Sequence, residues 1–155
     1  EESYALIEEL DLDWASFSIA SPVRGSQLYV QAKANGWLED DFGVGKLLHN
    51  SYQMKIPGVD PEKIVDAAYR MNLNWNFVNN RALRNKDYQT AQRLFMEVTE
   101  RTTEHAFAHW FLSVTNQKLG LLKDADASRM QALTLFDGDP KWNKWAQEFG
   151  INYQN

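Results

Sequence analysis

The spacing of apolar residues divides the chain into a short mixed front and a long helical remainder. Tyr4, Ile7 and Leu10 recur at helical spacing and predict a helix over residues 1–10. Residues 14–20 alternate apolar with small or polar side chains, a pattern typical of a strand with one buried face. The front of the chain is therefore predicted to place a strand directly after a helix.

A turn and a second helix are expected after this strand. Pro22 and Gly25 favour a turn. Ser26 can accept a hydrogen bond from the first turn of a helix, so it predicts a helix over residues 27–35. Residues 37–58 contain several glycines and a proline among polar side chains and are predicted to be irregular.

The remainder of the chain has helical periodicity. Asp60 followed by Pro61 indicates a helix start, because a carboxylate caps the first turn and proline suits its geometry. Apolar spacing then predicts helices over residues 61–84, 87–102, 104–118, 122–136 and 140–149. The last helix carries Trp142 and Trp145, which would cover the open end of the helical array.

The helical part resembles itself after a shift of 34 residues. Under this shift Phe77 aligns with Phe111, and Ala91 aligns with Ala125. A period of 34 residues is that of the tetratricopeptide repeat, a helix–turn–helix unit that buries its apolar face by stacking on its neighbours. The unit over residues 72–104 keeps more of that family's pattern than the second unit does. The chain is thus similar to tetratricopeptide proteins, which bind other proteins.

The predicted fold class is mainly α, with a small α/β part in front. A lone strand over residues 14–20 would need partners for its backbone groups, and helices flank it on both sides. This helix–strand–helix order is the repeating piece of an α/β barrel. The predicted organisation is an α/β barrel remnant over residues 1–40, a linker over 41–59, and tetratricopeptide-like α–α superhelical repeats with a C-terminal capping helix over 60–155.

The front also resembles a known enzyme family. The segment Pro-x-x-Gly-[Ser/Thr]-x-Leu-Tyr follows the last strand of radical S-adenosylmethionine enzymes with a cobalamin-binding domain, including the anaerobic magnesium-protoporphyrin ester cyclase group. The matching residues are Pro22, Gly25, Ser26, Leu28 and Tyr29. Arg24 differs, because proline is common there. The resemblance covers about residues 1–40 and implies that the chain is a C-terminal fragment of such an enzyme.

This resemblance implies cofactors for the parent protein only. The parent would use S-adenosylmethionine, a [4Fe–4S] cluster and cobalamin. The cluster motif Cys-x-x-x-Cys-x-x-Cys is missing here, and the chain contains no cysteine at all. We therefore expect no cofactor in this chain and no catalytic residue of its own.

Composition narrows the kinds of partner. The 155 residues carry a formal net charge of −5, which argues against nucleic-acid binding because phosphate surfaces need clustered Lys and Arg. No apolar run approaches the roughly 20 residues that a membrane helix needs. The absence of cysteine excludes disulfides and thiolate catalysis within the chain. We expect a cytoplasmic protein that binds a protein or an acidic peptide segment.

A candidate peptide groove follows from the repeat register, because the first helix of each tetratricopeptide unit lines the groove. The groove positions are Asn76, Asn80, Arg84, Trp110, Val114 and Lys118. Arg84 and Lys118 are equivalent, so two cations should stand side by side and attract an acidic segment. Asn80 would hold the backbone of that segment and Trp110 would anchor it. A solvated face without any ligand is the alternative.

Three other features suggest chemistry only weakly. His105 and His109 have the i, i+4 spacing of metal ligands, but no third ligand is evident and core packing is the ordinary explanation. Residues 43–46 (Gly-Val-Gly-Lys) lack the spacing of a phosphate loop. Glu39, Asp40 and Asp41 form a charge run typical of a solvated surface.

Two functions remain open from the sequence. The first is a non-catalytic module of a radical S-adenosylmethionine enzyme that docks a partner or closes the barrel. The second is a tetratricopeptide adaptor that binds acidic peptide segments through Arg84 and Lys118. Because an unpaired strand edge is a template for another chain, we also expect self-association through residues 1–40.

Overall fold

The computed structural model describes residues 2–38 and 52–153. The chain forms two compact units, one made of Glu1–Ala15 with Asn72–Asn155 and the other of Ser16–Met71. The first unit, here called the helical unit, is therefore built from both ends of the chain. The described residues form helices and no strand, so the mainly α character is confirmed.

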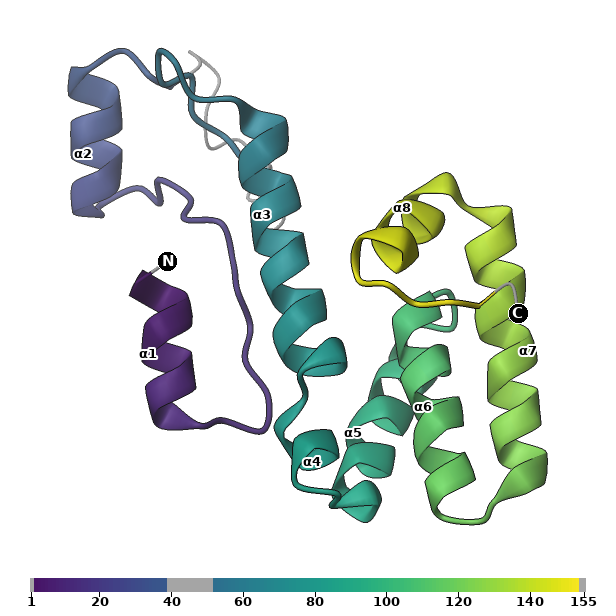
Figure 1. The fold of residues 1–155 in the computed structure, drawn as a ribbon. Coiled ribbons are helices and arrows are strands. Elements are labelled where there is room, and N and C mark those ends of the chain that lie inside the picture. Colours follow the sequence, from purple (N-terminus) through teal and green to yellow (C-terminus); the bar gives the residue numbers. More distant parts are fainter. Residues whose placement is uncertain (1, 39–51, 154–155) are drawn as a thin grey trace. The chain divides into compact units, whose positions relative to one another are not determined.

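Successive antiparallel helices form most of the helical unit (Figure 1). Its helices are α1 (Glu2–Leu10), α4 (Arg81–Arg84), α5 (Tyr88–Arg101), α6 (Ala106–Lys118), α7 (Leu122–Gly138) and α8 (Pro140–Glu148). α6 packs against both α5 and α7. The chain turns sharply between α6 and α7 at Gly120, whose φ of +76° favours glycine.

Local side-chain bonds explain where these helices begin. Asp87 accepts a hydrogen bond from the Thr90 N–H at 3.1 Å and caps α5. Asp139 accepts one from the Lys141 N–H at 2.8 Å and caps α8, with Pro140 in its first turn. The predicted helices over residues 1–10, 27–35, 87–102, 104–118, 122–136 and 140–149 are confirmed to within two residues at each end.

A continuous aromatic cluster forms the core of the helical unit. The ring of Phe77 lies 5.7 Å from that of Phe95, and Phe107 lies 6.0 Å from Phe136. Trp142 of α8 packs against Phe107 at 5.9 Å. Fully buried alanines on α5, α6, α7 and α8 let the helix backbones approach closely around these rings: Ala91, Ala106, Ala108, Ala132 and Ala146. α8 therefore covers one end of the α6–α7 pair, as the tryptophan spacing predicted.

The helix predicted over residues 61–84 is wrong as a single element. It consists of α3 (Pro61–Leu73), a π-helical turn η1 (Asn74–Val78) and the separate α4. The Asn79 N–H bonds to the Asn74 carbonyl at 2.7 Å, which is the wide i→i+5 pattern of a π-turn. Asn80 then starts a new helix, because its side chain accepts hydrogen bonds from the first N–H groups of α4.

The strand predicted over residues 14–20 is also wrong, because this described segment has no regular secondary structure. A side chain takes the place of a neighbouring strand at Ala15, whose N–H and carbonyl both bond to Asn76. The strand that an α/β barrel remnant over residues 1–40 requires is thus absent from this described segment. Without a strand edge in these residues, the expected self-association through residues 1–40 loses its physical reason.

The second unit contains α2 (Gln27–Ala34) and most of α3. Ser26 caps α2 as predicted, because its Oγ accepts a hydrogen bond from the Tyr29 N–H at 3.1 Å. The preceding turn uses Gly25, whose φ is +91°. The Lys55 N–H donates to the Trp37 carbonyl at 2.8 Å and closes this unit's irregular part. Part of the predicted linker, residues 41–51, lies outside the described residues.

Only some of the positions related by the 34-residue shift share their degree of burial. Ala91 of α5 and Ala125 of α7 are both buried, and Met96 and Met130 on the same helices are both exposed. Phe95 is fully buried, however, whereas Arg129 at the shifted position is exposed, so α5 and α7 present only partly similar faces to α6. The assignment to the tetratricopeptide family stays a prediction.

Candidate peptide-binding site

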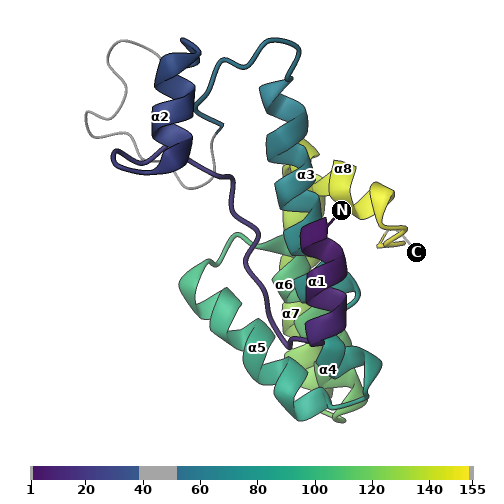
Figure 2. The same ribbon diagram turned by 90° about the vertical axis from the view of Figure 1, so that its left-hand side faces the viewer.

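The helical unit holds an extended segment of its own chain. α1 is followed by a reversal beside α4, and the chain then continues in an extended conformation (Figures 1 and 2). Residues 11–15 of this stretch, here called the bound segment, contact four polar side chains from η1, α4 and the capping residue that precedes α4. These four, here called the clamp, are Asn76, Asn80, Arg81 and Arg84.

Asn76 bonds to both backbone groups of Ala15. Its Oδ1 accepts a hydrogen bond from the Ala15 N–H at 2.9 Å, and its Nδ2 donates to the Ala15 carbonyl at 2.7 Å. Both bonds are buried, and Asn76 is 3% exposed. A primary amide thus offers the donor and acceptor that a peptide group in a neighbouring strand would offer. This contact recognises an extended backbone.

Asn80 links the bound segment to the start of α4. Its Nδ2 donates to the Asp13 carbonyl at 3.3 Å and to the Asn76 carbonyl at 3.1 Å. Its Oδ1 accepts from the N–H groups of Ala82 and Leu83. The capping bonds fix the side chain, so its amide faces the bound segment in one orientation.

Two arginines neutralise the carboxylates of the bound segment. Arg81 Nε lies 2.6 Å from Asp11 Oδ2, and Arg81 Nη1 lies 2.8 Å from Asp13 Oδ1. Arg84 Nη2 lies 3.2 Å from the other oxygen of Asp11. Hydrogen bonds to Asp11 and Asp13 raise the pKa of Arg81 above its ordinary value. All these side chains are about half exposed, so salt screens the ion pairs.

Aromatic rings pack under the bound segment and α1. Trp14 meets Phe77 edge to face, with ring centroids 5.4 Å apart. Tyr4 meets Trp75 at 5.8 Å in the same geometry, and its hydroxyl accepts a hydrogen bond from Asn74. Such pairs add to the free energy of burying the rings themselves. Trp14 therefore connects the bound segment to the aromatic core.

The predicted groove residues separate into two groups. Asn76, Asn80 and Arg84 come together in the clamp. Trp110 instead packs on α7, where it lies under the guanidinium of Arg129 at 5.2 Å, and Val114 is half-buried on α6. Lys118 ends α6 as an exposed residue, while Arg84 pairs with Asp11.

The degree of burial differs from the expectation of an open groove. Asn76 and Asn80 are almost fully buried, because residues 13–15 lie over them. The repeat register also missed Arg81, which contributes two of the three ion pairs in the clamp. The sequence contains one signal for this contact: two aspartates, Asp11 and Asp13, could be paired with two arginines, Arg81 and Arg84.

His105 has a structural role at the start of α6. Its Nδ1 accepts a hydrogen bond from the Ala108 N–H at 3.1 Å, and its ring lies 4.8 Å from Phe77 and 4.9 Å from Trp142. Burial is the main cause that lowers its pKa from 6.5 to about 4. His105 directly precedes α6 as its capping residue, and its ring packs against the aromatic core.

His109 makes a separate contact. Its Nε2 lies 2.9 Å from the Thr103 carbonyl, a distance at which the ring nitrogen donates a hydrogen bond. Among residues 2–38 and 52–153, no group of three or more His, Asp or Glu side chains is arranged to hold a metal ion. Neither histidine is thus part of a recognisable metal centre in this part of the chain.

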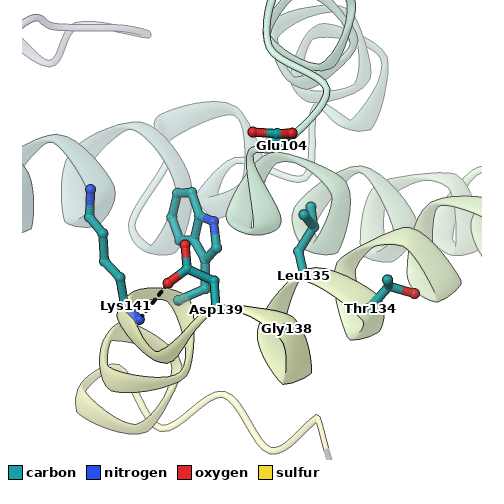
Figure 3. Close-up of a pocket in the computed structure, with 7 residues that line it drawn as sticks. Glu104, Thr134, Leu135, Gly138, Asp139 and Lys141 are labelled. Carbon is teal, nitrogen blue, oxygen red and sulfur yellow. Dashed lines mark hydrogen bonds between the residues drawn. The ribbon is translucent and has the colours of Figure 1, made fainter.

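A pocket of about 350 Å³ lies where α7 meets α8 (Figure 3). It is lined by Glu104, Thr134, Leu135, Gly138, Asp139, Lys141 and Trp142. The Asp139 carboxylate already caps α8, and Lys141 lies over the Trp142 ring at 5.9 Å. Two carboxylates and one ammonium group share this lining with uncharged residues, and this arrangement selects no particular ligand.

Two weaker sequence features lie outside the described residues: Gly43–Lys46 and the charge run Glu39, Asp40 and Asp41. Among the helices that the structure describes, none is long and apolar enough to cross a membrane. Comparison with protein-family models, curated proteins and solved structures finds no match to the chain. The geometry of the clamp is therefore the basis for assigning a function.

Replacing Asn76 by alanine should destabilise the helical unit. The substitution leaves two buried backbone groups of Ala15 without partners, which costs about 2–4 kcal/mol in the free energy of unfolding. Urea denaturation followed by circular dichroism measures this loss. Asn79→Ala is the control, because Asn79 is exposed on the same turn and bonds only to Asn74 among the described side chains. Equal effects of the two substitutions would contradict the assigned role of Asn76.

His105 should make stability depend on pH. In the unfolded chain it titrates near its ordinary pKa of about 6.5, whereas the folded pKa is about 4. The unfolded state thus binds more protons between these values. The contribution of His105 to the free energy of unfolding is fully present above its pKa in the unfolded chain. As the pH drops from there toward its pKa in the folded chain, the free energy of unfolding falls by about 1.4 kcal/mol per pH unit.

Urea denaturation between about pH 7 and pH 5 tests this dependence, with His105→Asn as the comparison. Asparagine keeps an acceptor for capping α6 but does not titrate. The variant should be less stable at neutral pH because it loses ring packing, yet its stability should change less with pH. Parallel curves for the two proteins would refute the assignment.

Proposed function

We propose that this chain is a protein-interaction module that grips an extended acidic segment through the clamp. The observation that carries the proposal is the pair of hydrogen bonds between the Asn76 amide and the backbone of Ala15. A contact of this kind recognises an extended main chain whatever its side chains are. In the structure the bound segment of the same chain occupies the clamp.

The charges of the clamp support acidic partners. Arg81 and Arg84 present three guanidinium nitrogens to two carboxylates. Guanidinium–carboxylate hydrogen bonds are short and directional, so they favour acidic side chains at fixed positions along the bound chain. The pair that binds acids in this proposal is Arg81 and Arg84, in place of the pair of Arg84 and Lys118 expected from the repeat register.

A labelled peptide of residues 9–18 tests the proposal on the full chain. The occupied clamp must first be weakened, so the acceptor is the double variant Asp11→Asn, Asp13→Asn. This variant should bind the peptide about tenfold more tightly than the unmodified chain, because its own segment lacks the charges that Arg81 and Arg84 attract. Fluorescence anisotropy at low and high salt measures binding, which should weaken with salt.

Charge reversal supplies the control for this experiment. Arg81→Glu with Arg84→Glu, added to the double variant, should abolish binding. Lys118→Glu with Lys123→Glu changes the net charge equally at exposed positions on α6 and α7 and should leave binding intact. Loss of binding in both cases would mean that net charge alone attracts the peptide, and the proposal would fail.

A second candidate is that the clamp is a permanent internal brace. The bound segment directly precedes residues 17–29, which carry the resemblance to radical S-adenosylmethionine enzymes. In such a parent protein the clamp would tie the helical unit to the end of the barrel. This function is the docking or barrel-closing module expected from the sequence.

Hydrogen exchange at the Ala15 amide separates the two candidates. If the bound segment can be displaced from the clamp, the Ala15 amide hydrogen should exchange through local release of that segment. This opening requires a lower free energy than global unfolding. In a permanent brace it should exchange only with the core amides, such as that of Phe107. Exchange of Ala15 and Phe107 at the same free energy would favour the brace.

A further inference from the structure

The contacts of the bound segment also define its sequence preference. We infer that the partner is a segment of another protein with the order acidic, any residue, acidic, aromatic, small, and that it binds by displacing residues 11–15. This inference rests on the proposed function and names the partner of the same site. Each position follows from one contact in the structure.

The two acidic positions follow from the ion pairs. The Asp11 carboxylate bridges Arg81 and Arg84, using a different oxygen for each. Asp13 pairs with a second nitrogen of Arg81, Nη1, and its carbonyl accepts a hydrogen bond from Asn80. Between them Leu12 is 39% exposed, so its side chain is not selected by the clamp.

The aromatic and small positions follow from burial. Trp14 packs edge-on against Phe77, a ring of the aromatic core. Ala15 is 8% exposed, and Asn76 binds its N–H and its carbonyl at once. A longer side chain at this place would have to push aside neighbours in a close-packed interior. The last position therefore selects glycine, alanine or serine.

The bound segment is held weakly enough to be displaced. α1, which precedes it, buries none of its residues, and Leu6 and Leu10 are more than half exposed. The ion pairs at Asp11 and Asp13 are about half exposed and are screened by salt, so together they contribute only about the tenfold in affinity that replacing both carboxylates should remove. Within the bound segment close packing is confined to Trp14 and Ala15, and α1 adds the contact of Tyr4 with Trp75 and Asn74. Local release of this arm therefore requires much less disruption than global unfolding.

Peptide variants test the preference against the Asp11→Asn, Asp13→Asn acceptor. In the peptide of residues 9–18, Leu12→Gln should bind within about twofold of the parent peptide, because that side chain is partly exposed and makes none of the clamp's hydrogen bonds. Asp11→Asn with Asp13→Asn, Trp14→Ser and Ala15→Leu should each weaken binding by about tenfold or more. If the Trp14→Ser and Ala15→Leu peptides bound as tightly as the parent peptide, the inferred sequence preference would be overturned.

Displacement has its own measurement, because the chain contains no cysteine. The variant Leu12→Cys takes a single fluorescent label on the bound segment. Unlabelled parent peptide, added to this otherwise unmodified full chain, should lower the anisotropy of the label as residues 11–15 are released. If the anisotropy of the label did not change when the chain was saturated with peptide, the peptide would bind elsewhere. The inferred displacement of residues 11–15 would then be wrong.

The outcomes distinguish this inference from the proposed function. If peptides bind through Arg81 and Arg84 but with no preference at Trp14 and Ala15, the clamp stands and the sequence preference fails. If no peptide binds, both fail. Light scattering tests whether a second copy supplies the segment. If the chain forms a dimer that the added peptide of residues 9–18 dissociates, the partner is a second copy of this chain, which would contradict the inference.

Discussion

The attachment of the first 15 residues to the rest of the helical unit depends on the hydrogen bonds between Asn76 and Ala15. This unit combines the first 15 residues of the chain with residues 72–155, so a contact must hold these two parts together. At Ala15 the backbone is buried, and a buried N–H and carbonyl need partners. A single amide supplies both, and Asn80, Arg81 and Arg84 extend the contact toward the solvent. The clamp is therefore polar and basic, and the bound segment that it holds is acidic.

The break between η1 and α4 makes this contact possible. A helix continuing through residue 80 would keep its backbone N–H groups paired internally. Here the π-turn ends at Asn79, and the Asn80 side chain caps a new helix while still facing Asp13. The same asparagine thus stabilises α4 and binds the segment. The irregular backbone lies where the clamp lies, which agrees with the general association of π-turns with binding sites.

The sequence predicted the helices well because their signals are local. Apolar periodicity and capping side chains such as Asp87 and Asp139 fix a helix within a few residues of chain. The alternating pattern of residues 14–20 predicted a strand that is absent, because alternation shows only that one face of the segment is buried. A strand also needs a neighbouring strand that pairs with its backbone. Asn76, 61 residues away from Ala15, supplied that pairing. No local pattern reveals a side chain that replaces a neighbouring strand.

The candidate site was predicted in part for the same reason. Repeat register placed Asn80 and Arg84 on one surface and suggested an acidic peptide with its backbone held by asparagine. It could not show that Asp11 and Asp13 of the same chain would occupy that surface. An occupant in the same chain competes at a high effective concentration, so a partner binds only if its contacts exceed those of the occupant. Because the ion pairs are exposed and α1 has no buried residue, a partner needs few additional contacts to displace the bound segment. The clamp is therefore suited to exchanging its own segment for that of a partner.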